Sequence, residues 1–147
     1  MQSAIRQHMR VAQEVRISKG RIRTGWAITG LTTAFLLFDV AAKFAKPAQV
    51  IEALARSGWP AELSVPVGAI LLACTILYLN ILYLIPRTSV LGAILLTAYL
   101  GGAVATNLRL ENPLFTHTLF PVYFGVLIWV GLWLRESRLG TVFPLLR

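Results

Sequence analysis

The sequence predicts an all-α, polytopic membrane protein: an antiparallel four-helix transmembrane bundle with a short interfacial helix after the first span. Of the 147 residues, 56% are hydrophobic and 14% are charged, whereas about a quarter of the residues of a typical soluble domain are charged. Charged residues are absent from four long stretches, 26–38, 63–86, 88–108 and 112–134. Apolar windows of about 20 residues match the roughly 30 Å hydrocarbon core of a bilayer. The predicted spans are 25–45, 64–85, 89–108 and 119–134, within a transmembrane domain of residues 25–140.

The first span follows a basic tail, residues 1–24. Apolar residues are too scattered in this tail to choose between an interfacial helix and a disordered segment. The basic residues, the apolar run 26–38 and the small residues Val40-Ala41-Ala42 also match a cleavable signal peptide. The long tail and the two charges late in the span, Asp39 and Lys43, favour a span that is retained.

Residues 46–60, "KPAQVIEALARSGWP", predict a short amphipathic helix. Pro47 suits its start, Glu52 and Arg56 are spaced to pair at i,i+4, and Gly58 suits its end. Trp59 is typical of a membrane–water boundary. We expect this helix to lie flat on the outer surface of the membrane.

The short segment "IPRTSV" joins the second and third spans and predicts an antiparallel hairpin. In the third span, Thr97, Gly101 and Ala105 recur at every fourth position, and Gly102 belongs to a second such series. Small residues at this spacing let helix backbones approach closely in lipid, so we expect them to serve helix packing.

The distribution of basic residues predicts the orientation. If both termini are cytoplasmic, including the C-terminal tail 141–147, ten of the basic residues lie on the cytoplasmic side, as the positive-inside rule requires. These ten are Arg6, Arg10, Arg16, Lys19, Arg21, Arg23, Arg87, Arg135, Arg138 and Arg147. This pattern favours contact with a lipid bilayer and argues against binding of nucleic acid.

Polar residues that are scattered in the sequence are expected to meet at one depth. At 1.5 Å per residue, Asp39 lies roughly 21 Å along the first span, and Lys43 lies one turn beyond it. Gly25, Thr32 and Asp39 recur every seven residues, which predicts a face that points into the bundle. The candidate cluster at the outer end consists of Asp39, Lys43, Asn107, Arg109 and His117.

Two interpretations of this cluster remain open. In the first, Asp39 and Lys43 form a buried polar clasp, completed by Arg109 or Asn107, while Lys43 reaches toward the headgroups. In the second, Asp39, His117 and Arg109 line a pocket that binds or protonates a small ligand. Charges inside a membrane are costly and often functional, which keeps the second interpretation open.

The sequence contains no recognisable catalytic motif. A single cysteine, Cys74, leaves no internal disulfide and no Cys-x-x-Cys pair. Two histidines, one of them in the tail, predict no haem site, and no His/Glu cluster has metal-ligand spacing. We therefore expect no catalytic residues, no metal site and no cofactor, and a protein that is not an enzyme by itself.

Three segments resemble the DoxX-like family of small bacterial membrane proteins: "LLFDVAAKF", "LYLIPRTSVLGAILLTAYLGGAVATNLR" and "PLFTHTLFPVYFGVLIWVGLWLR". The resemblance covers about residues 24–140 and implies four transmembrane helices in a bacterial cytoplasmic (inner) membrane. Related sequences often have histidine where this chain has Asn107, so the cluster lacks a titratable group at that position.

The resemblance leaves two functions open. One is a non-catalytic accessory protein or subunit that binds a lipid-like ligand or a partner span through the polar outer-leaflet cluster. The other is a quinone-linked membrane component that depends on a redox partner protein, because the family takes its name from such a subunit. The absence of haem ligands, cysteine pairs and flavin motifs favours the first. The sequence does not indicate an oligomeric state.

Overall fold

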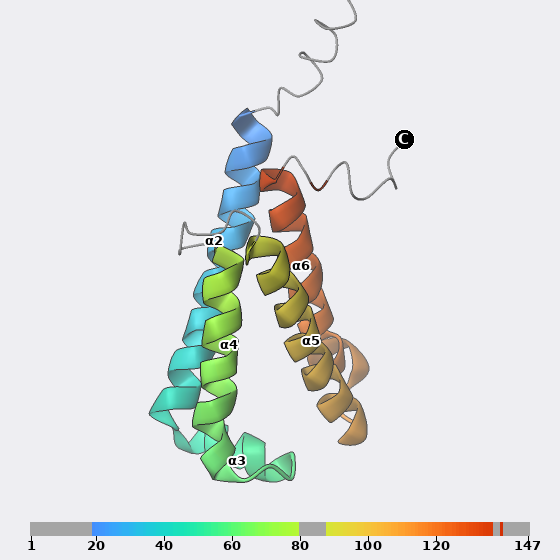
Figure 1. The fold of residues 1–147 in the computed structure, drawn as a ribbon. Coiled ribbons are helices and arrows are strands. Elements are labelled where there is room, and N and C mark those ends of the chain that lie inside the picture. Colours follow the sequence, from blue (N-terminus) through green and yellow to red (C-terminus); the bar gives the residue numbers. More distant parts are fainter. Residues whose placement is uncertain (1–18, 80–87, 137–138, 140–147) are drawn as a thin grey trace, which may run out of the picture.

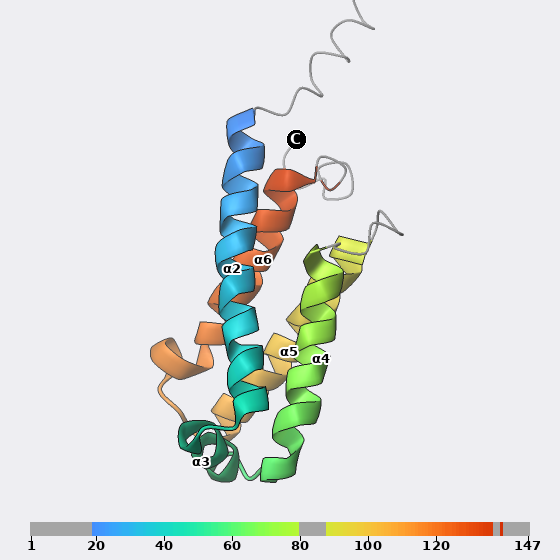
Figure 2. The same cartoon turned by 90° about the vertical axis from the view of Figure 1, so that its left-hand side faces the viewer.

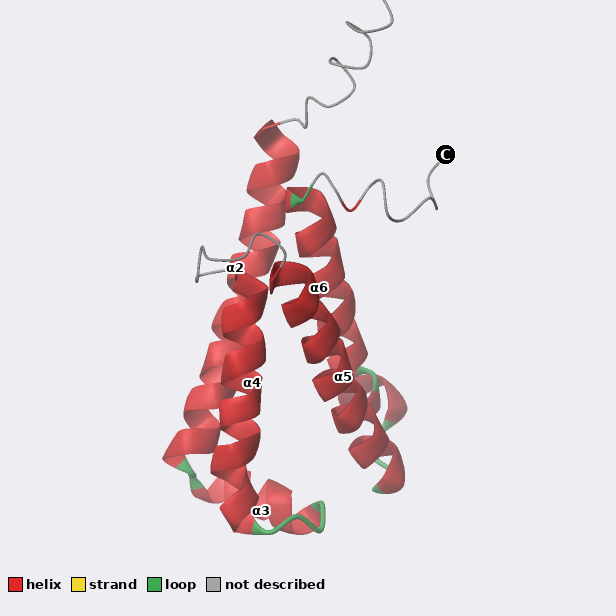
Figure 3. Ribbon diagram, in the orientation of Figure 1, coloured by secondary structure: helices red, strands yellow, loops and turns green. Residues whose placement is uncertain are grey.

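The computed structural model describes residues 19–79, 88–136 and 139, and every regular element in these ranges is helical (Figure 3). In chain order the elements are α2 (Lys19–Ala45), α3 (Ala48–Arg56), the 3₁₀ turn η1 (Ala61–Leu63), α4 (Ser64–Leu79), α5 (Thr88–Arg109), the π-helical turn η2 (Leu114–Thr118) and α6 (Phe120–Arg135). Most of the basic tail, the turn between the second and third spans, and the C-terminal tail 141–147 lie outside the described residues.

Within the described residues, four helical segments are long and apolar enough to cross a membrane: 19–45, 61–79, 88–109 and 114–135. They overlap the four predicted spans and confirm the all-α bundle; the predicted end of the second span, residues 80–85, lies outside the described residues. Helix α2 begins at Lys19, ahead of the predicted start at Gly25. The helix extends into the polar segment because Arg21 stacks over the ring of Trp133, 4.5 Å from its centroid, and donates a hydrogen bond to the Trp133 carbonyl oxygen.

The four long helices form a ring in which each packs against two neighbours. Helix α2 contacts α4 and α6, and α5 contacts the same two helices. Figures 1 and 2 show α2 and α5 running in one direction and α4 and α6 in the other. We call the end with the start of α2 and the end of α6 the terminal end, and the opposite end, crossed by α3, the α3 end.

Glycines allow close approach of the helices in the half of the bundle nearest the terminal end. A Cβ atom at Gly92 of α5 would overlap the backbone of Tyr78 in α4. A Cβ atom at Gly25 of α2 would lie 2.9 Å from the backbone nitrogen of Arg135 in α6, and one at Gly131 would meet α2 as closely. These glycines therefore fix where α4 meets α5 and where α2 meets α6.

Arg135 ties three helices together at the terminal end. Its guanidinium lies over the rings of Trp26 and Tyr78, 4.9 Å from each centroid, and donates a hydrogen bond of 2.7 Å to the Tyr78 carbonyl oxygen. The Tyr78 hydroxyl in turn donates to the Ile128 carbonyl oxygen at 3.0 Å. These cation–π contacts and hydrogen bonds hold α2, α4 and α6 at one place.

The core lies along the axis of the ring, and its side chains come from all four helices and from Leu139. It consists of Leu36, Val40, Leu71, Cys74, Tyr78, Ala93, Leu96, Ile128, Leu132 and Leu139. Large apolar side chains also cover the outside of the helices; Leu31 and Phe38, for example, are 73% and 72% exposed. An apolar outer surface of this kind suits a bundle surrounded by hydrocarbon.

Helices α4 and α5 diverge toward the α3 end (Figure 1), where α3 crosses below them. Helix α3 ends in a Schellman motif: Gly58 has a φ of 72°, and the backbone N–H of Trp59 donates to the Leu54 carbonyl oxygen at 2.9 Å. Gly58 thus ends the helix, as the sequence predicts. The divergence of α4 and α5 above α3 provides the space for the site described next.

Candidate functional site: a polar cavity at the α3 end

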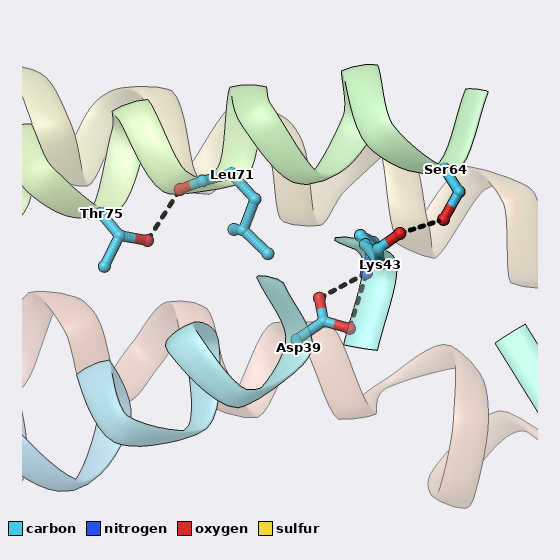
Figure 4. A network of polar contacts seen from close by, with 5 residues as sticks. All are labelled: Asp39, Lys43, Ser64, Leu71 and Thr75. Atoms are coloured by element: carbon cyan, nitrogen blue, oxygen red, sulfur yellow. Dashed lines mark hydrogen bonds and ion pairs between the residues drawn. The ribbon is translucent and has the colours of Figure 1, made fainter. Parts of the chain in front are cut away.

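Asp39 and Lys43 form an ion pair one turn apart on α2 (Figure 4). The Lys43 Nζ atom donates to the two carboxylate oxygens of Asp39 at 2.6 and 2.5 Å. The Asp39 side chain is 36% exposed and that of Lys43 is 18% exposed. The ammonium therefore turns back to the carboxylate and does not reach outward, and the cation is the less exposed partner.

Contacts with α4 hold the Lys43 side chain in this position. A Cβ atom at Gly68 would lie 3.0 Å from the Lys43 Cβ atom, so the absence of a side chain at Gly68 lets the lysine stem pass. The Ser64 hydroxyl donates a 2.7 Å hydrogen bond to the Lys43 carbonyl oxygen (Figure 4). The helix ends at Ala45, Lys46 has a φ of 50°, and Pro47 has no N–H, so the i→i−4 series does not continue to this carbonyl. The buried Ser64 therefore replaces the missing helical donor.

A cavity of about 680 Å³ lies beside this pair, between the diverging halves of α4 and α5. Its walls come from α2, α3, α4, α5 and the segment around η2. They are mostly apolar near the middle of the bundle and polar near α3. The lining residues are Lys43, Ala53, Leu54, Arg56, Ser57, Trp59, Val67, Ile70, Ala98, Tyr99, Gly102, Ala103, Thr106, Asn107, Leu110, Asn112 and His117.

The end of α5 places two asparagines in the cavity wall. Glu111 has a φ of 54°, and the Asn112 N–H donates to the Asn107 carbonyl oxygen at 3.1 Å, which again forms a Schellman motif. This turn brings the Asn112 side-chain amide to the Asn107 Oδ1 atom at 2.7 Å. The Asn107 amide donates to the Ala103 carbonyl oxygen at 2.9 Å. The two asparagines therefore satisfy each other and the helix, not Asp39.

Arg109 lies at the edge of the cavity, outside its lining. Its Nη2 atom donates to the carbonyl oxygen of Ser57 at the end of α3, and a Cβ atom at Gly58 would lie 3.4 Å from the guanidinium. Arg109 thus connects α5 to α3, and among the described residues its hydrogen bond goes to Ser57 and not to Asp39. In this arrangement Arg109 and Asn107 each donate to a backbone carbonyl oxygen, and the Asp39 carboxylate is paired with Lys43 alone among the described residues.

His117 lies in η2 and lines the cavity. Its Nδ1 atom is 2.8 Å from the hydroxyl oxygen of the neighbouring Thr116, so the Nε2 atom remains available for another partner. Lys43, Asn107 and His117 therefore share one cavity, as expected from their common depth. Asp39 pairs with Lys43 but does not line the cavity itself, and Arg109 lies at the edge of the cavity.

The face that carries Gly25, Thr32 and Asp39 turns inward only in part. Gly25 and Thr32 are buried, and Thr32 is 1% exposed, but Asp39 is 36% exposed. The change along the helix has a physical cause: the neighbouring helices are close around Gly25 and diverge toward the α3 end.

The small residues of α5 have surroundings different from those expected for close packing. A Cβ atom at Gly101 or Gly102 would meet no atom within 4 Å in the described structure, and Thr97 and Ala105 are exposed. Thr97 accepts a 2.9 Å hydrogen bond from the Trp129 indole N–H of α6. The close contacts between helices are made instead by Gly25, Gly92 and Gly131. Gly102 lines the cavity, and Gly101 lines a shallower apolar groove beside α6.

The predicted cluster lacks six polar or aromatic residues of the cavity wall: Arg56, Ser57, Trp59, Tyr99, Thr106 and Asn112. Arg56 and Trp59 belong to the interfacial segment, which the sequence identified as a helix at the surface. No sequence signal indicated that this segment would close a cavity. Tyr99 and Asn112 line the same cavity as Lys43 because α5 diverges from α4 (Figure 1).

The ring of four apolar helices and the half-buried ion pair define the chain as a multi-pass helical membrane protein. The family model described as the DoxX-like family matches residues 27–131, which is more than half of the chain. The chain therefore belongs to the DoxX-like family. The matched range includes every residue of the predicted polar cluster. No curated protein and no solved structure matches the chain.

Proposed function

We propose that this protein is a non-catalytic accessory or subunit protein of the membrane that binds a lipid-like ligand in the cavity at the α3 end. One observation carries the proposal: a cavity of about 680 Å³ with apolar walls between α4 and α5 and a polar end under α3. Ligand sites are typically concave, mostly apolar and supplied with a few polar groups, and their volumes are about 300–1,000 Å³.

The side walls support entry from the membrane. Val67 and Ile70 of α4 face Ala98 and Gly102 of α5 across the cavity. Ile70 is 56% exposed and Gly102 is exposed, so this part of the cavity opens sideways. An acyl chain that enters between α4 and α5 would place its polar head near Lys43.

A pair of glycine variants tests ligand binding. Gly102→Leu fills the cavity, whereas Gly101→Leu adds the same side chain at the adjacent position outside it. Both glycines have free space around them, so both variants should fold. Native mass spectrometry of the detergent-purified proteins should detect a retained lipid-like molecule in wild type and Gly101→Leu, and a strongly reduced amount in Gly102→Leu. Equal retention by all three proteins, or no retention by wild type, would contradict the proposal.

The quinone-linked alternative concerns the same cavity. An organic extract of the purified protein that contains quinone at about one molecule per chain, lost in Gly102→Leu, would favour that alternative. Co-purification of a redox subunit would favour it as well.

The proposed location is the bacterial inner membrane, with both termini in the cytoplasm. The excess of basic residues at the terminal end supports this orientation. The test uses single cysteines at exposed helical positions in a Cys74→Ala background: Arg23→Cys at the terminal end and Glu52→Cys on α3. An impermeant thiol reagent added to intact cells should label position 52 and spare position 23. The reverse pattern would invert the proposed topology.

A further inference from the structure

We propose that the cavity selects single-chain amphiphiles with an acidic headgroup, such as a long-chain carboxylate. This inference rests on the proposed function and adds the chemical class of the ligand. It follows from the hydrogen-bonding groups that face the cavity, from their charge and from the shape of the space.

Several polar groups of the cavity wall can donate hydrogen bonds. Lys43 has three N–H groups, and Asp39 offers two oxygens to them. Tyr99 and Trp59 also line the cavity, and the Tyr99 hydroxyl and the Trp59 indole N–H have no hydrogen-bond partner among the described residues. His117 lines it too, and its Nε2 atom donates or accepts according to the tautomer. The two asparagine side chains also bring acceptors to the wall: Asn107 Oδ1, which accepts one hydrogen bond from the Asn112 amide, and Asn112 Oδ1. A headgroup that accepts several hydrogen bonds, as a carboxylate does, matches the donors of Lys43, Tyr99 and Trp59.

The charge of the wall favours an acid over a neutral acceptor. Asp39 neutralises Lys43, and the carboxylate itself is not part of the lining. Arg56 also lines the cavity; its Nε atom donates to the Glu52 backbone carbonyl oxygen, and it has no carboxylate partner among the described residues. No aspartate or glutamate of the described chain lines the cavity. An acidic headgroup would supply the missing counter-charge to Arg56.

The shape of the cavity favours one chain. Its volume of about 680 Å³ is in the range of sites for drug-sized ligands, which is smaller than a two-chain phospholipid needs. The apolar part lies between two helices only, with Ile70 on one side and Ala98 on the other. One acyl chain can lie in this space while its head meets Arg56 and Tyr99.

Trp59 provides a probe of binding inside the cavity. Bromine-labelled octadecanoate and bromine-labelled octadecanol have the same chain and differ in the headgroup, and bromine quenches the fluorescence of a nearby indole. The protein would be held in nanodiscs of zwitterionic lipid and titrated with each probe. Subtraction of the signal of Trp59→Phe isolates quenching at the cavity. We expect the carboxylate to bind about tenfold more tightly than the alcohol, as for one added charged hydrogen bond.

Two variants test the assignment, and a third serves as the control for charge. Arg56→Gln should reduce the preference for the carboxylate several-fold and leave alcohol binding unchanged. Lys46→Gln removes the same charge from an exposed site at the same end but outside the cavity, and should keep the preference. Tyr99→Phe removes only a hydroxyl and should weaken binding of both probes. Arg56 is exposed on α3, so its variant should fold.

The outcomes separate the two proposals. Equal binding of carboxylate and alcohol at Trp59 would overturn the acidic-headgroup inference and leave the lipid-like function standing. An unchanged preference in Arg56→Gln would also overturn the inference. Absence of Trp59-specific quenching by both probes would overturn the lipid-like function as well.

Discussion

Asp39 and Lys43 show how a charged pair is accommodated beside a membrane span. Each charge compensates the other, and the Lys43 stem packs over Gly68. Removal of one partner leaves the other charge without compensation in a half-buried place, which usually costs more than removal of both. The pair is partly exposed, so water reduces this cost.

We expect Asp39→Ala and Lys43→Ala each to lower the free energy of unfolding in detergent by about 1–2 kcal/mol. Lys43→Ala should cost more, because it also removes the packing over Gly68. The double variant should be less destabilised than the sum of the two single variants. Strictly additive losses would show that the two charges act independently. Single variants that are stable but retain no ligand would assign the pair to binding.

The hydrogen bond from the Ser64 hydroxyl to the Lys43 carbonyl oxygen can be tested by itself. Ser64→Ala leaves the half-buried Lys43 carbonyl oxygen without this donor, so we expect a loss of about 1–3 kcal/mol in the free energy of unfolding. Ser64→Cys keeps a side chain of nearly the same shape but offers only a weak S–H donor, so it should also lower the free energy of unfolding. A neutral Ser64→Cys beside a costly Ser64→Ala would show that Ser64 acts through packing alone.

Helix–helix approach is decided by glycines at crossing points. At Gly92 the two backbones of the α4–α5 pair leave no room for a side chain. At Gly101, nine residues further along the same helix, the space is open. The same residue type therefore has opposite roles in one element, depending on how far the helices have diverged.

Alanine at these two positions should give opposite results. Gly92→Ala forces α4 and α5 apart, and we expect a loss of about 1–3 kcal/mol or more, as for overpacking of a core. Gly101→Ala meets nothing and gains helix propensity, so it should be neutral or stabilising by up to about 1 kcal/mol. Thermal unfolding of both variants in the same detergent measures the difference. A marked loss in Gly101→Ala would indicate a close contact with a second chain.

The long helices pack closely at the terminal end, whereas α4 and α5 diverge at the α3 end. Arg135 joins α2, α4 and α6 at the first end, whereas the hydrogen bond from Arg109 to Ser57 connects α5 to α3 at the second. Helix α3 contacts α4 and η1 more weakly than the long helices contact each other. The position of α3 over the cavity therefore depends on few groups.

Arg109→Ala should loosen α3 without unfolding the bundle. We expect hydrogen exchange of residues 48–58 to rise by about tenfold, the equivalent of 1.4 kcal/mol for one charge-assisted hydrogen bond. Exchange in α6 should remain unchanged. Arg23→Ala, an exposed arginine at the terminal end, is the control. A uniform increase across all helices would show that Arg109 supports the whole fold and not α3 in particular.

The sequence by itself determined the fold class, the four spans and the spacing of Asp39 and Lys43. These features depend on local patterns: apolar runs of membrane length, and an i,i+4 interval that a helix converts directly into contact. It also identified the end of α3, because Gly58 adopts a conformation that other residues rarely take.

Only the tertiary structure decided which polar residues share a cavity. The positions of Lys43, Asn107 and His117 along their spans predict that they lie at one depth in the membrane, but these positions do not predict how the helices tilt. The divergence of α4 and α5 makes Tyr99 and Asn112 part of the cavity wall and leaves Gly101 and Gly102 without close neighbours. It also lets Arg109 donate to Ser57 at the end of α3 and not to Asp39. Helix crossing depends on side-chain and backbone contacts between distant segments, such as Gly92 against Tyr78, which no local pattern contains.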